Sequence, residues 1–417
     1  MRCIRIPESV LLPLSKCIDD IFIPSIFSED VNVKISGLTR EILELPCRLG
    51  GLAIPDPSKE AALSFSAATS ANRSLIESLI SGDYRKKDSP YNKQKHHIQK
   101  AKAKQQKEAQ VKQISERIKK DLRDCKSVEW AKIVLKLLEM NSQNGASSAL
   151  AVIPLAQYGF TLNSMEFRDL LSVRFNLPIR NLPQTCACGN KNSMQHASSC
   201  RMGGFRTRQH NQTVTLWGEL LCAAGATNLR NEMIIRAKNN DSDPAVSPLI
   251  RSDIAVDDGN SNTTHFDVTL VNPIAPSHIT KPVASAFKNA EHQKNRKYKQ
   301  VIKENLKQNF SPLVHNSITG LPQLAANQLF KDLVQDIANN TDQLYCDVMI
   351  SYRIRLAIAA ARTMSQNLRG NRRKPRRLFQ LSQPHNYTET LIAWKLQNYG
   401  GDSWSEGISD LGLDDSL

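Results

Sequence analysis

The chain has 417 residues, of which 40% are hydrophobic, and a formal net charge of +15 at pH 7. This length suits two or three globular domains with real cores. No apolar run is long enough to span a bilayer, and the N-terminus is too short and polar for a secretory signal. We therefore expect neither a membrane-spanning nor a secreted protein. The basic balance favours a polyanionic partner, although a merely basic globular protein would have the same composition.

Helical patterns fill the first part of the chain. Residues 1–80 are expected to form a small helical unit, in which the turn LPCRLGGLAIPDP precedes a helix capped by Ser58. Residues 81–126 change to a basic helical linker, and residues 127–183 return to apolar helical spacing as a connector. The composition of this linker favours a solvated helix, and contact with a phosphate backbone is the more specific alternative. The basic run at its start consists of Arg85, Lys86, Lys87, Lys93, Lys95, Lys100, Lys102, Lys104 and Lys107.

Residues 184–212 contain a cluster of soft metal ligands, Cys186, Cys188, His196 and Cys200. The other cysteines of the chain are scattered, as is typical of a reducing compartment rather than of a disulfide framework. Three thiolates and one imidazole with no spare position suit a closed tetrahedral Zn²⁺ site. Its role would be structural, because a loop-rich segment lacks the apolar mass to fold alone. Coincidence of free cysteines is the alternative, and the crowding argues against it.

Residues 213–345 combine helix and strand patterns. A helix over TVTLWGELLCAAGA is followed by strands over EMIIRA, IRSDIAVDD and HFDVTLVNP, a helix over ASAFKNAEHQKNRKYKQVIKENL and a short strand over SPLVH. The chain is therefore predicted to be α+β. Residues 346–417 are expected to hold a C-terminal helix and a basic, partly disordered tail, in which Arg372 and Arg373 are candidate nucleic-acid contacts.

Two aspartates lie inside strand-like apolar runs, Asp253 in IRSDIAV and Asp267 in HFDVTLV. A carboxylate among Ile, Val and Phe is costly unless it binds a metal or a partner. If the two strands pair, both carboxylates reach one edge and can coordinate Mg²⁺. The alternative is a pair of strand-end aspartates that cap turns, as is expected for Asp257 and Asp258.

The helical pattern after these strands places Glu291, Lys294 and Tyr298 on one face. An ammonium beside a metal-bound water can position it and stabilise charge on a phosphate. Lys297 lies near the same face and competes for this role. Taken alone, the segment is a solvated basic helix.

A His-Asn pair, His210 and Asn211, follows two arginines, Arg206 and Arg208. These side chains are expected to contact phosphate or to support the zinc loop, rather than to catalyse.

Taken together, these parts resemble the region downstream of the polymerase in non-LTR retroelements that carry a restriction-like endonuclease of the PD-(D/E)xK class. The resemblance covers residues 10 to 375. It rests on LPCRLGGLAIPDP, IPLAQYGFTLNSMEFRDLLSVRF, CACG…HASSC followed by GG and HN, RSDIAV, FDVTLVNP, and EHQKNRKYKQ followed by FSPLVHNSITG.

The resemblance implies a thumb-like helical N-terminal region, a zinc knuckle and an αβββα nuclease core. Asp253 and Asp267 would bind Mg²⁺, and Lys294 would be a catalytic lysine displaced from strand to helix. Glu232 or Glu219 would assist. Tyr298 and His210 would contact substrate or support the site, and Arg208 and Lys297 would contact nucleic acid. The partner would be DNA, with RNA as a second candidate, and the location nuclear or else cytoplasmic.

The sequence departs from the family pattern at three places. No lysine stands two residues after Asp267, Gln212 replaces an acid after the HN pair, and Ser252 replaces a proline before Asp253. No Tyr-x-Asp-Asp motif occurs, so no reverse-transcriptase activity is expected from this chain. Two alternatives to the endonuclease remain at this point: an inactive nucleic-acid-binding remnant, and a protein-interaction scaffold.

Overall fold

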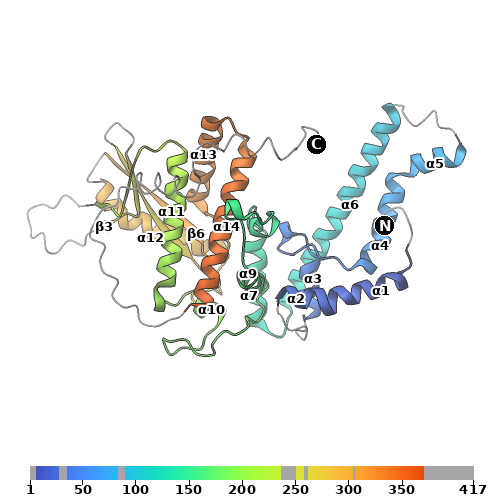
Figure 1. The fold of residues 1–417 in the computed structure, drawn as a ribbon, viewed down its shortest axis with the longest axis horizontal. Coiled ribbons are helices and arrows are strands. Elements are labelled where there is room, and N and C mark those ends of the chain that lie inside the picture. The colour runs from blue at the N-terminus through green and yellow to red at the C-terminus, as the bar shows by residue number, and fades with distance from the viewer. Residues whose placement is uncertain are drawn as a thin grey trace, which may run out of the picture. The chain divides into compact units, whose positions relative to one another are not determined.

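The structure, a computed structural model, describes residues 6–27, 35–82, 90–235, 250–257, 262–303 and 307–370 (Figure 1). It divides into two compact units. The first contains the described residues up to Cys200, together with Asn272–Val283 and Ala360–Gly370. The second contains Arg201–Val271 and Ala284–Ala359. The tail 371–417, with Arg372 and Arg373, and the cations Arg85, Lys86 and Lys87 lie outside the described residues.

The first unit is helical. Its main helices are α1 (Glu8–Cys17), α2 (Ile23–Phe27), α3 (Gly37–Glu44), α4 (Pro57–Ala71), α5 (Arg73–Ser81), α6 (Pro90–Arg123), α7 (Val128–Asn141), α8 (Ser148–Ala151), α9 (Ser164–Phe175) and α10 (Met194–Ala197). Short turns of other helix types lie at Ile18–Phe22 (η1), Cys47–Leu49 (η2) and Ala156–Tyr158 (η4). Side-chain caps fix several starts: Ser36 and Asp56 accept from backbone N–H groups of α3 and α4. Asn163 and Glu166 form a capping box at α9.

The linker helix α6 is part of this unit's core. Ile118 and Leu122, near its C-terminal end, are fully buried against residues of α3, α7 and α9. The three helical segments that the sequence separates, 1–80, 81–126 and 127–183, therefore share one apolar cluster. Side chains of much of the basic half of α6 are not described, but Lys104 is exposed.

A buried arginine organises the turn LPCRLGGLAIPDP. Arg174 of α9 donates to Cys47 O at 3.3 Å, to Gly51 O at 3.4 Å and to Ser147 Oγ at 2.8 Å. Gly50 has φ +91°, and a Cβ on Gly51 would lie 1.9 Å from Leu45 O, so this turn requires its two glycines.

An ion pair with a buried carboxylate connects α9 to the last helix of this unit. The carboxylate of Asp169 in α9 accepts two bonds of 2.6 Å from the guanidinium of Arg369, and one from the Ser365 hydroxyl. Arg369 ends α14 (Tyr345–Arg369), whose last residues belong to this unit. Because a bidentate Arg–carboxylate pair fixes both planes, it holds α9 against the end of α14.

The second unit is a mixed sheet between helices. Its elements are α11 (Phe205–Ala223), β1 (Asn228–Asn231), β2 (Ile234–Ile235), β3 (Ile250–Arg251), β4 (Ile254–Asp257), β5 (Thr263–Val271), α12 (Val283–Lys303), β6 (Gln308–Asn316), α13 (Leu324–Thr341) and the first part of α14. The four-stranded sheet has the order β1-β4-β5-β6, and β2 pairs with β3 separately. The pairs β1–β4 and β4–β5 are antiparallel, whereas β5 and β6 are parallel and joined through α12.

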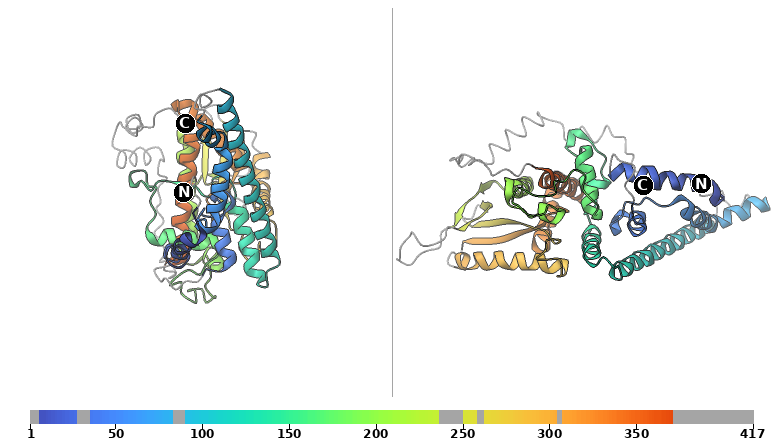
Figure 2. Two further views of the ribbon diagram at one scale, coloured as in Figure 1. Left: turned by 90° about the vertical axis from the view of Figure 1, so that its right-hand side faces the viewer. Right: turned by 90° about the horizontal axis from the view of Figure 1, so that it is seen from below.

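Alternation along β5 separates an apolar face from a polar one. Phe266 and Val268 enter the main core with Trp217 of α11 and Phe330 of α13. Asp267 points to the opposite face, where α12 lies, and Figure 2 shows that α12 covers one side of the sheet and α11 and α13 the other. The predicted α+β class is confirmed. Among the described residues, no helix is long and apolar enough to cross a membrane.

A buried histidine connects α11 to β6. Trp217 Nε1 donates to His315 Nε2, and His315 Nδ1 lies 3.0 Å from the carbonyl oxygen of Gly320. His315 is fully buried, and burial lowers its pKa to about 4. A proton on Nε2 would also point at the Trp217 N–H, so the neutral ring is the form that this contact requires.

The unfolded chain takes up a proton at His315 below about pH 6.5, and the folded chain does so only below about pH 4. We therefore predict that stability falls as the pH drops through this window, with a loss that approaches about 3 kcal/mol at pH 4. Urea unfolding of the parent and of His315→Gln at pH 7 and pH 4.5 measures this loss. The variant should be less stable at pH 7 but should lose less on acidification. Equal losses for both proteins would contradict the assignment.

Candidate functional site

The Cys/His cluster of the first unit is assembled by a tight loop and a short helix. Within the loop, Cys186 N donates to Asn190 O at 2.9 Å. Ser193 caps α10, and this short helix carries His196 toward the loop. The ligand atoms of Cys186, Cys188, His196 and Cys200 all lie within 4.8 Å of one another. The sequence spacing is thus sufficient to bring the four predicted ligands together.

The distances fit a tetrahedral ion. Two thiolates at a Zn–S bond length of about 2.3 Å subtend an edge of about 3.8 Å, and the Sγ atoms of Cys186 and Cys200 are 3.8 Å apart. Cys188 Sγ lies 3.3 Å from His196 Nε2. Hydrogen bonds from Asn190 lower the pKa of the Cys188 thiol to about 7, whereas burial raises that of Cys186. The cluster can hold a metal ion such as zinc.

A second constellation lies in the second unit, at the start of β4. Ile254 is the register partner of Phe266 in β5, yet Asp253 N also donates to Phe266 O at 3.0 Å. Two residues of one strand therefore face a single residue of the other, which is a β-bulge. The bulge re-aims the Asp253 side chain, whose Oδ2 accepts the Val268 N–H at 2.6 Å. Asp253 is thereby held beside Asp267, its neighbour across the strand pair.

Two side chains of α12 meet the Asp267 carboxylate. Lys294 Nζ lies 2.7 Å from Asp267 Oδ2, and the Tyr298 hydroxyl donates to the same oxygen at 2.9 Å. Tyr298 OH is also 2.6 Å from the Arg251 carbonyl oxygen, and its ring stacks on Phe310 at 4.0 Å between centroids. The helical spacing predicted for Lys294 and Tyr298 is thus realised on the face that covers β5.

His210 approaches the site from the other layer. Its Nε2 lies 3.2 Å from Asp253 Oδ2, and its Nδ1 lies 3.3 Å from Asn211 Oδ1. The sequence placed the His-Asn pair at the end of the zinc knuckle, but α11 begins at Phe205, so both residues lie within this helix. A helix that starts earlier carries His210 to Asp253, and no contact of His210 with the Cys/His cluster is among those described.

The acid pair is electrostatically asymmetric. Burial raises the pKa of Asp267, the nearby Asp253 raises it further, and Lys294 only partly offsets them. Burial would also raise the pKa of Asp253, but hydrogen bonds from His210 and Val268 outweigh it and the pKa falls. The contact with Asp253 in turn raises the pKa of His210. The Asp253 carboxylate is therefore held charged, and the Asp267 carboxylate lies where a cation would be stabilised.

Other predicted residues take different positions. The carboxylate of Glu232 pairs with Arg251 at 3.1 Å, and Glu219 pairs with Arg355 at 3.7 Å. Neither side-chain carboxylate has a described contact with the carboxylates of Asp253 or Asp267, although the Glu232 backbone N donates to the Asp253 carbonyl oxygen. Glu291 accepts from Ala325 N at 3.3 Å, so it caps α13 instead of facing the acids.

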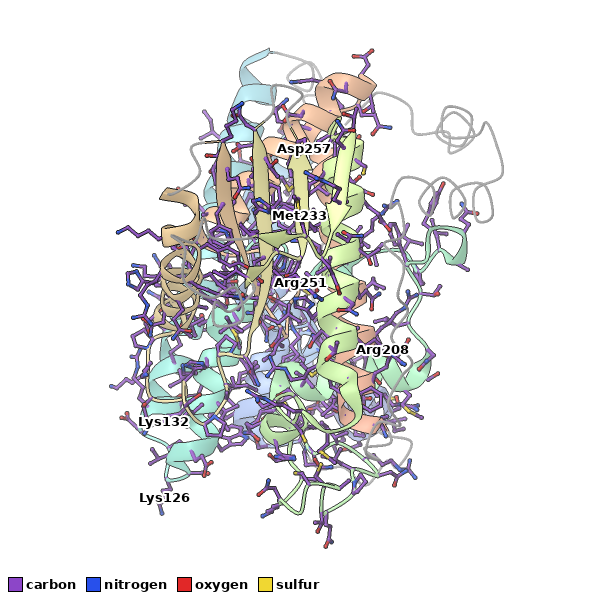
Figure 3. The ribbon with its side chains drawn as sticks, turned by 90° about the vertical axis from the view of Figure 1, so that its left-hand side faces the viewer. Lys126, Lys132, Arg208, Met233, Arg251 and Asp257 are labelled. Carbon is purple, nitrogen blue, oxygen red and sulfur yellow. The ribbon has the colours of Figure 1, made fainter. Side chains whose placement is uncertain are left out.

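The two lysines of α12 that the sequence left in competition also separate. The ammonium of Lys297 lies over the Tyr298 ring, 4.9 Å from its centroid, whereas Lys294 reaches Asp267. Arg208 is exposed and lies over the Phe205 ring at 5.8 Å. Figure 3 labels Arg208 and Arg251 on one view of the molecule, and both belong to the second unit.

Sequence reasoning missed three parts of this constellation. The Val268 N–H depends on the bulge, and the Arg251 carbonyl is a backbone group, so neither leaves a mark in residue types. The stacking of Phe310 on Tyr298 depends on the parallel register of β6 beside β5, which sets Phe310 opposite His265. That register places Phe310 on the α12 side of the sheet.

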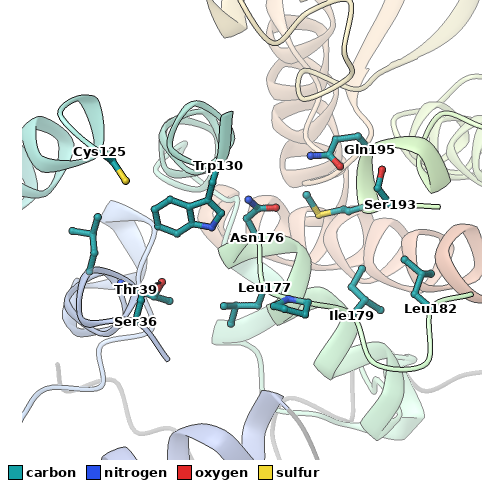
Figure 4. A pocket seen from close by; sticks show the side chains of 13 residues that line it. Ser36, Thr39, Cys125, Trp130, Asn176, Leu177, Ile179, Leu182, Ser193 and Gln195 are labelled. Atoms are coloured by element: carbon teal, nitrogen blue, oxygen red, sulfur yellow. Dashed lines mark hydrogen bonds between the residues drawn. The ribbon is translucent and has the colours of Figure 1, made fainter. Parts of the chain in front are cut away.

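The first unit also contains an apolar groove of about 720 Å³ (Figure 4). Its walls come from α3, α7, the segment after α9 and the start of α10, with Trp130, Asn176 and Gln195 among the lining residues. Its lining includes one thiol, Cys125, and the hydroxyls of Ser36, Thr39 and Ser193, but no acidic or basic side chain that could activate them. The groove therefore presents no catalytic set.

No protein-family model matches the chain, and no curated protein matches it significantly. The functional assignment therefore depends on the geometry of the site.

The metal cluster predicts one equivalent of zinc per chain, measured by inductively coupled plasma mass spectrometry on purified protein. Cys200→Ser should lose the metal and increase hydrogen exchange in residues 184–204, because three ligands hold zinc less tightly than four. Cys17→Ser, at an exposed cysteine of α1 outside the cluster, is the matched control and should keep the metal. A parent protein without zinc, or a Cys200→Ser variant with full occupancy, would refute the site.

Proposed function

We propose that the second unit is a metal-dependent DNA endonuclease of the restriction-like class, related to those of non-LTR retroelements. The observation that carries the proposal is the meeting of Asp253, Asp267 and Lys294 at one end of the strand pair, with Lys294 Nζ 2.7 Å from Asp267 Oδ2. An acid pair beside an ammonium is the set of groups that metal-dependent phosphodiester hydrolysis needs. The order α11, β1, β4, β5, α12, with β6 after it, is compatible with an αβββα core.

The acid pair fits a hard divalent cation such as Mg²⁺. Carboxylate oxygens are its preferred protein ligands. The contacts that His210, Val268, Lys294 and Tyr298 make with the two aspartates use the Oδ2 atoms, and the two carboxyl groups lie within hydrogen-bond reach of each other. Both side chains are largely buried, so two adjacent negative charges are costly without a cation. When bound, the ion would polarise the phosphate and supply a water nucleophile at neutral pH.

The chain's own residues would then orient the reaction. Val268 N–H and His210 fix Asp253, and Tyr298 fixes Asp267 by joining it to the Arg251 carbonyl. Lys294, a quarter exposed, would donate to the attacked phosphate and position the attacking water. On this proposal Arg208 and Lys297, both exposed, contact phosphates on either side of the acids.

An inactive DNA-binding remnant is the second candidate. The observation that favours it is the Lys294–Asp267 ion pair itself, because an ammonium at 2.7 Å compensates the buried carboxylate without a metal. Ser252 and Gln212, which replace residues of the family pattern, point the same way. The two candidates differ in a single measurable property, hydrolysis in the presence of Mg²⁺.

The endonuclease proposal predicts that Asp253→Asn and Asp267→Asn each abolish Mg²⁺-dependent nicking of supercoiled plasmid while leaving DNA affinity nearly intact. Lys294→Ala should lower the single-turnover rate at saturating DNA by about 10²–10³-fold, as the loss of one donor to a developing charge does. Lys297→Ala is the matched control on the same helix and should lower this rate far less. An Asp253→Asn/Asp267→Asn double variant that nicks as fast as the parent would eliminate the proposal and leave the inactive remnant.

DNA binding should depend strongly on salt. Each Lys or Arg that contacts a phosphate contributes about −0.9 to the slope of log affinity against log salt. Arg208→Gln and Lys297→Gln should each make the slope shallower by about that amount, measured by fluorescence anisotropy with a duplex oligonucleotide. A parent whose affinity does not change between low and high salt would reject both the endonuclease and the binding remnant, and would favour a scaffold.

A further inference from the structure

An exposed ion pair stands next to the acid pair in the second unit. Arg251 in β3 pairs with Ile234 of β2, and Glu232 lies two residues before Ile234. The Arg251 Nη1 atom is 3.1 Å from Glu232 Oε2, and the two side chains are 56% and 74% exposed. The sequence suggested Glu232 as a catalytic helper, but its carboxylate is directed to this arginine.

The backbones of both partners are tied to the candidate active site. The Tyr298 hydroxyl oxygen lies 2.6 Å from the Arg251 carbonyl oxygen and 2.9 Å from Asp267 Oδ2. Glu232 N donates to the carbonyl oxygen of Asp253 at 3.1 Å. Glu232 has φ +50°, in the left-handed region that Glu rarely adopts. The ion pair is therefore held at the edge of the acid pair by main-chain contacts, while its side-chain atoms stay open to solvent.

The energetics of this pair allow exchange. An exposed Arg–Glu pair contributes about 0–1 kcal/mol, because water and salt screen it. A guanidinium binds phosphate at two points and keeps its charge at every physiological pH. A DNA phosphate beside Asp253 would therefore displace the Glu232 carboxylate from Arg251 at small cost.

A second ion pair on the same hairpin offers a contrast. Arg230 in β1 binds both carboxylate oxygens of Asp257 at 2.6 and 2.9 Å, and the Thr263 hydroxyl adds a third bond of 2.7 Å. Asp257 lies at the end of β4 that is remote from Asp253, and Figure 3 labels it apart from Arg251. Three described hydrogen bonds therefore hold the Asp257 carboxylate, whereas one holds the Glu232 carboxylate.

We propose that Arg251 contacts a phosphate of duplex DNA next to the bond held at Asp253 and Asp267, and that Glu232 occupies Arg251 in the free protein and competes with that phosphate. The inference rests on the proposed function for the identity of the ligand. Glu232 then acts as an internal substitute for phosphate, so that only a DNA phosphate bound correctly beside Asp253 and Asp267 displaces it from Arg251.

The test is a double-mutant cycle on the full-length protein, with affinity for a duplex oligonucleotide measured by anisotropy in Ca²⁺, across a salt series. Glu232→Gln should bind about two- to five-fold more tightly, the equivalent of losing one competing surface pair. Arg251→Gln should bind more weakly, with a salt slope shallower by about 0.9. Glu232→Gln added to Arg251→Gln should have no effect, because the arginine for which Glu232 and the phosphate compete is already absent. Asp257→Asn, which changes the net charge by the same amount, should leave affinity unchanged.

Three results would overturn the inference. Equal tightening by Glu232→Gln and Asp257→Asn would show a general charge effect. An unchanged salt slope in Arg251→Gln would show that this arginine contacts no phosphate. Loss of single-stranded RNA binding in Arg251→Gln without loss of duplex binding would assign the arginine to another nucleic acid. Nicking by the parent in Mg²⁺ is measured separately. If the parent nicks DNA but the Glu232 and Arg251 variants do not change affinity as expected, only this inference is rejected. If the variants change affinity as expected but the parent does not nick DNA, only the endonuclease is rejected.

Discussion

The buried carboxylate of Asp267 is the constraint on which the second unit depends. It lies in the middle of β5 with only 7% of its side chain exposed, where an unpaired charge would be costly. Lys294 and Tyr298 compensate it, and both come from α12. The crossover helix is thus held over the sheet by polar contacts to one oxygen as well as by apolar packing. A helix placed by packing alone could slide along its axis, whereas two hydrogen bonds to one atom fix its register.

The β-bulge at Asp253 follows from the same requirement. In regular antiparallel register the two aspartates would stand side by side with no donor between them, and like charges so placed destabilise a strand pair. The bulge gives the Val268 N–H to Asp253 and leaves the strand ladder locally incomplete. His210 adds a second donor from the opposite layer. The structure therefore separates the two acids electrostatically, so that one is held charged by donors and the other is stabilised by an ammonium.

The sequence predicted those features that depend on residue type and spacing. Alternation in HFDVTLV placed Asp267 on a strand face, and the helical spacing of Lys294 and Tyr298 placed both on one side of α12. The Cys/His spacing predicted a cluster whose atoms do meet. The bulge, the earlier start of α11 and the Glu232–Arg251 pair were not predicted, because each depends on how segments far apart in sequence meet. The burial of Ile118 and Leu122 likewise shows that a charge run predicts one face of a helix and not its other face.

Lys294 is carried by a helix and not by a strand, and this position is compatible with its proposed role. What an ammonium contributes to a phosphate or a water is its charge and its three donors at a given point, and the backbone that carries it is immaterial. The parallel connection from β5 to β6 must cross one face of the sheet, and α12 crosses on the face to which Asp267 points. A four-carbon side chain on that helix reaches the carboxylate across the gap between the layers. The absence of a lysine two residues after Asp267 therefore removes a sequence pattern without removing the charge from the site.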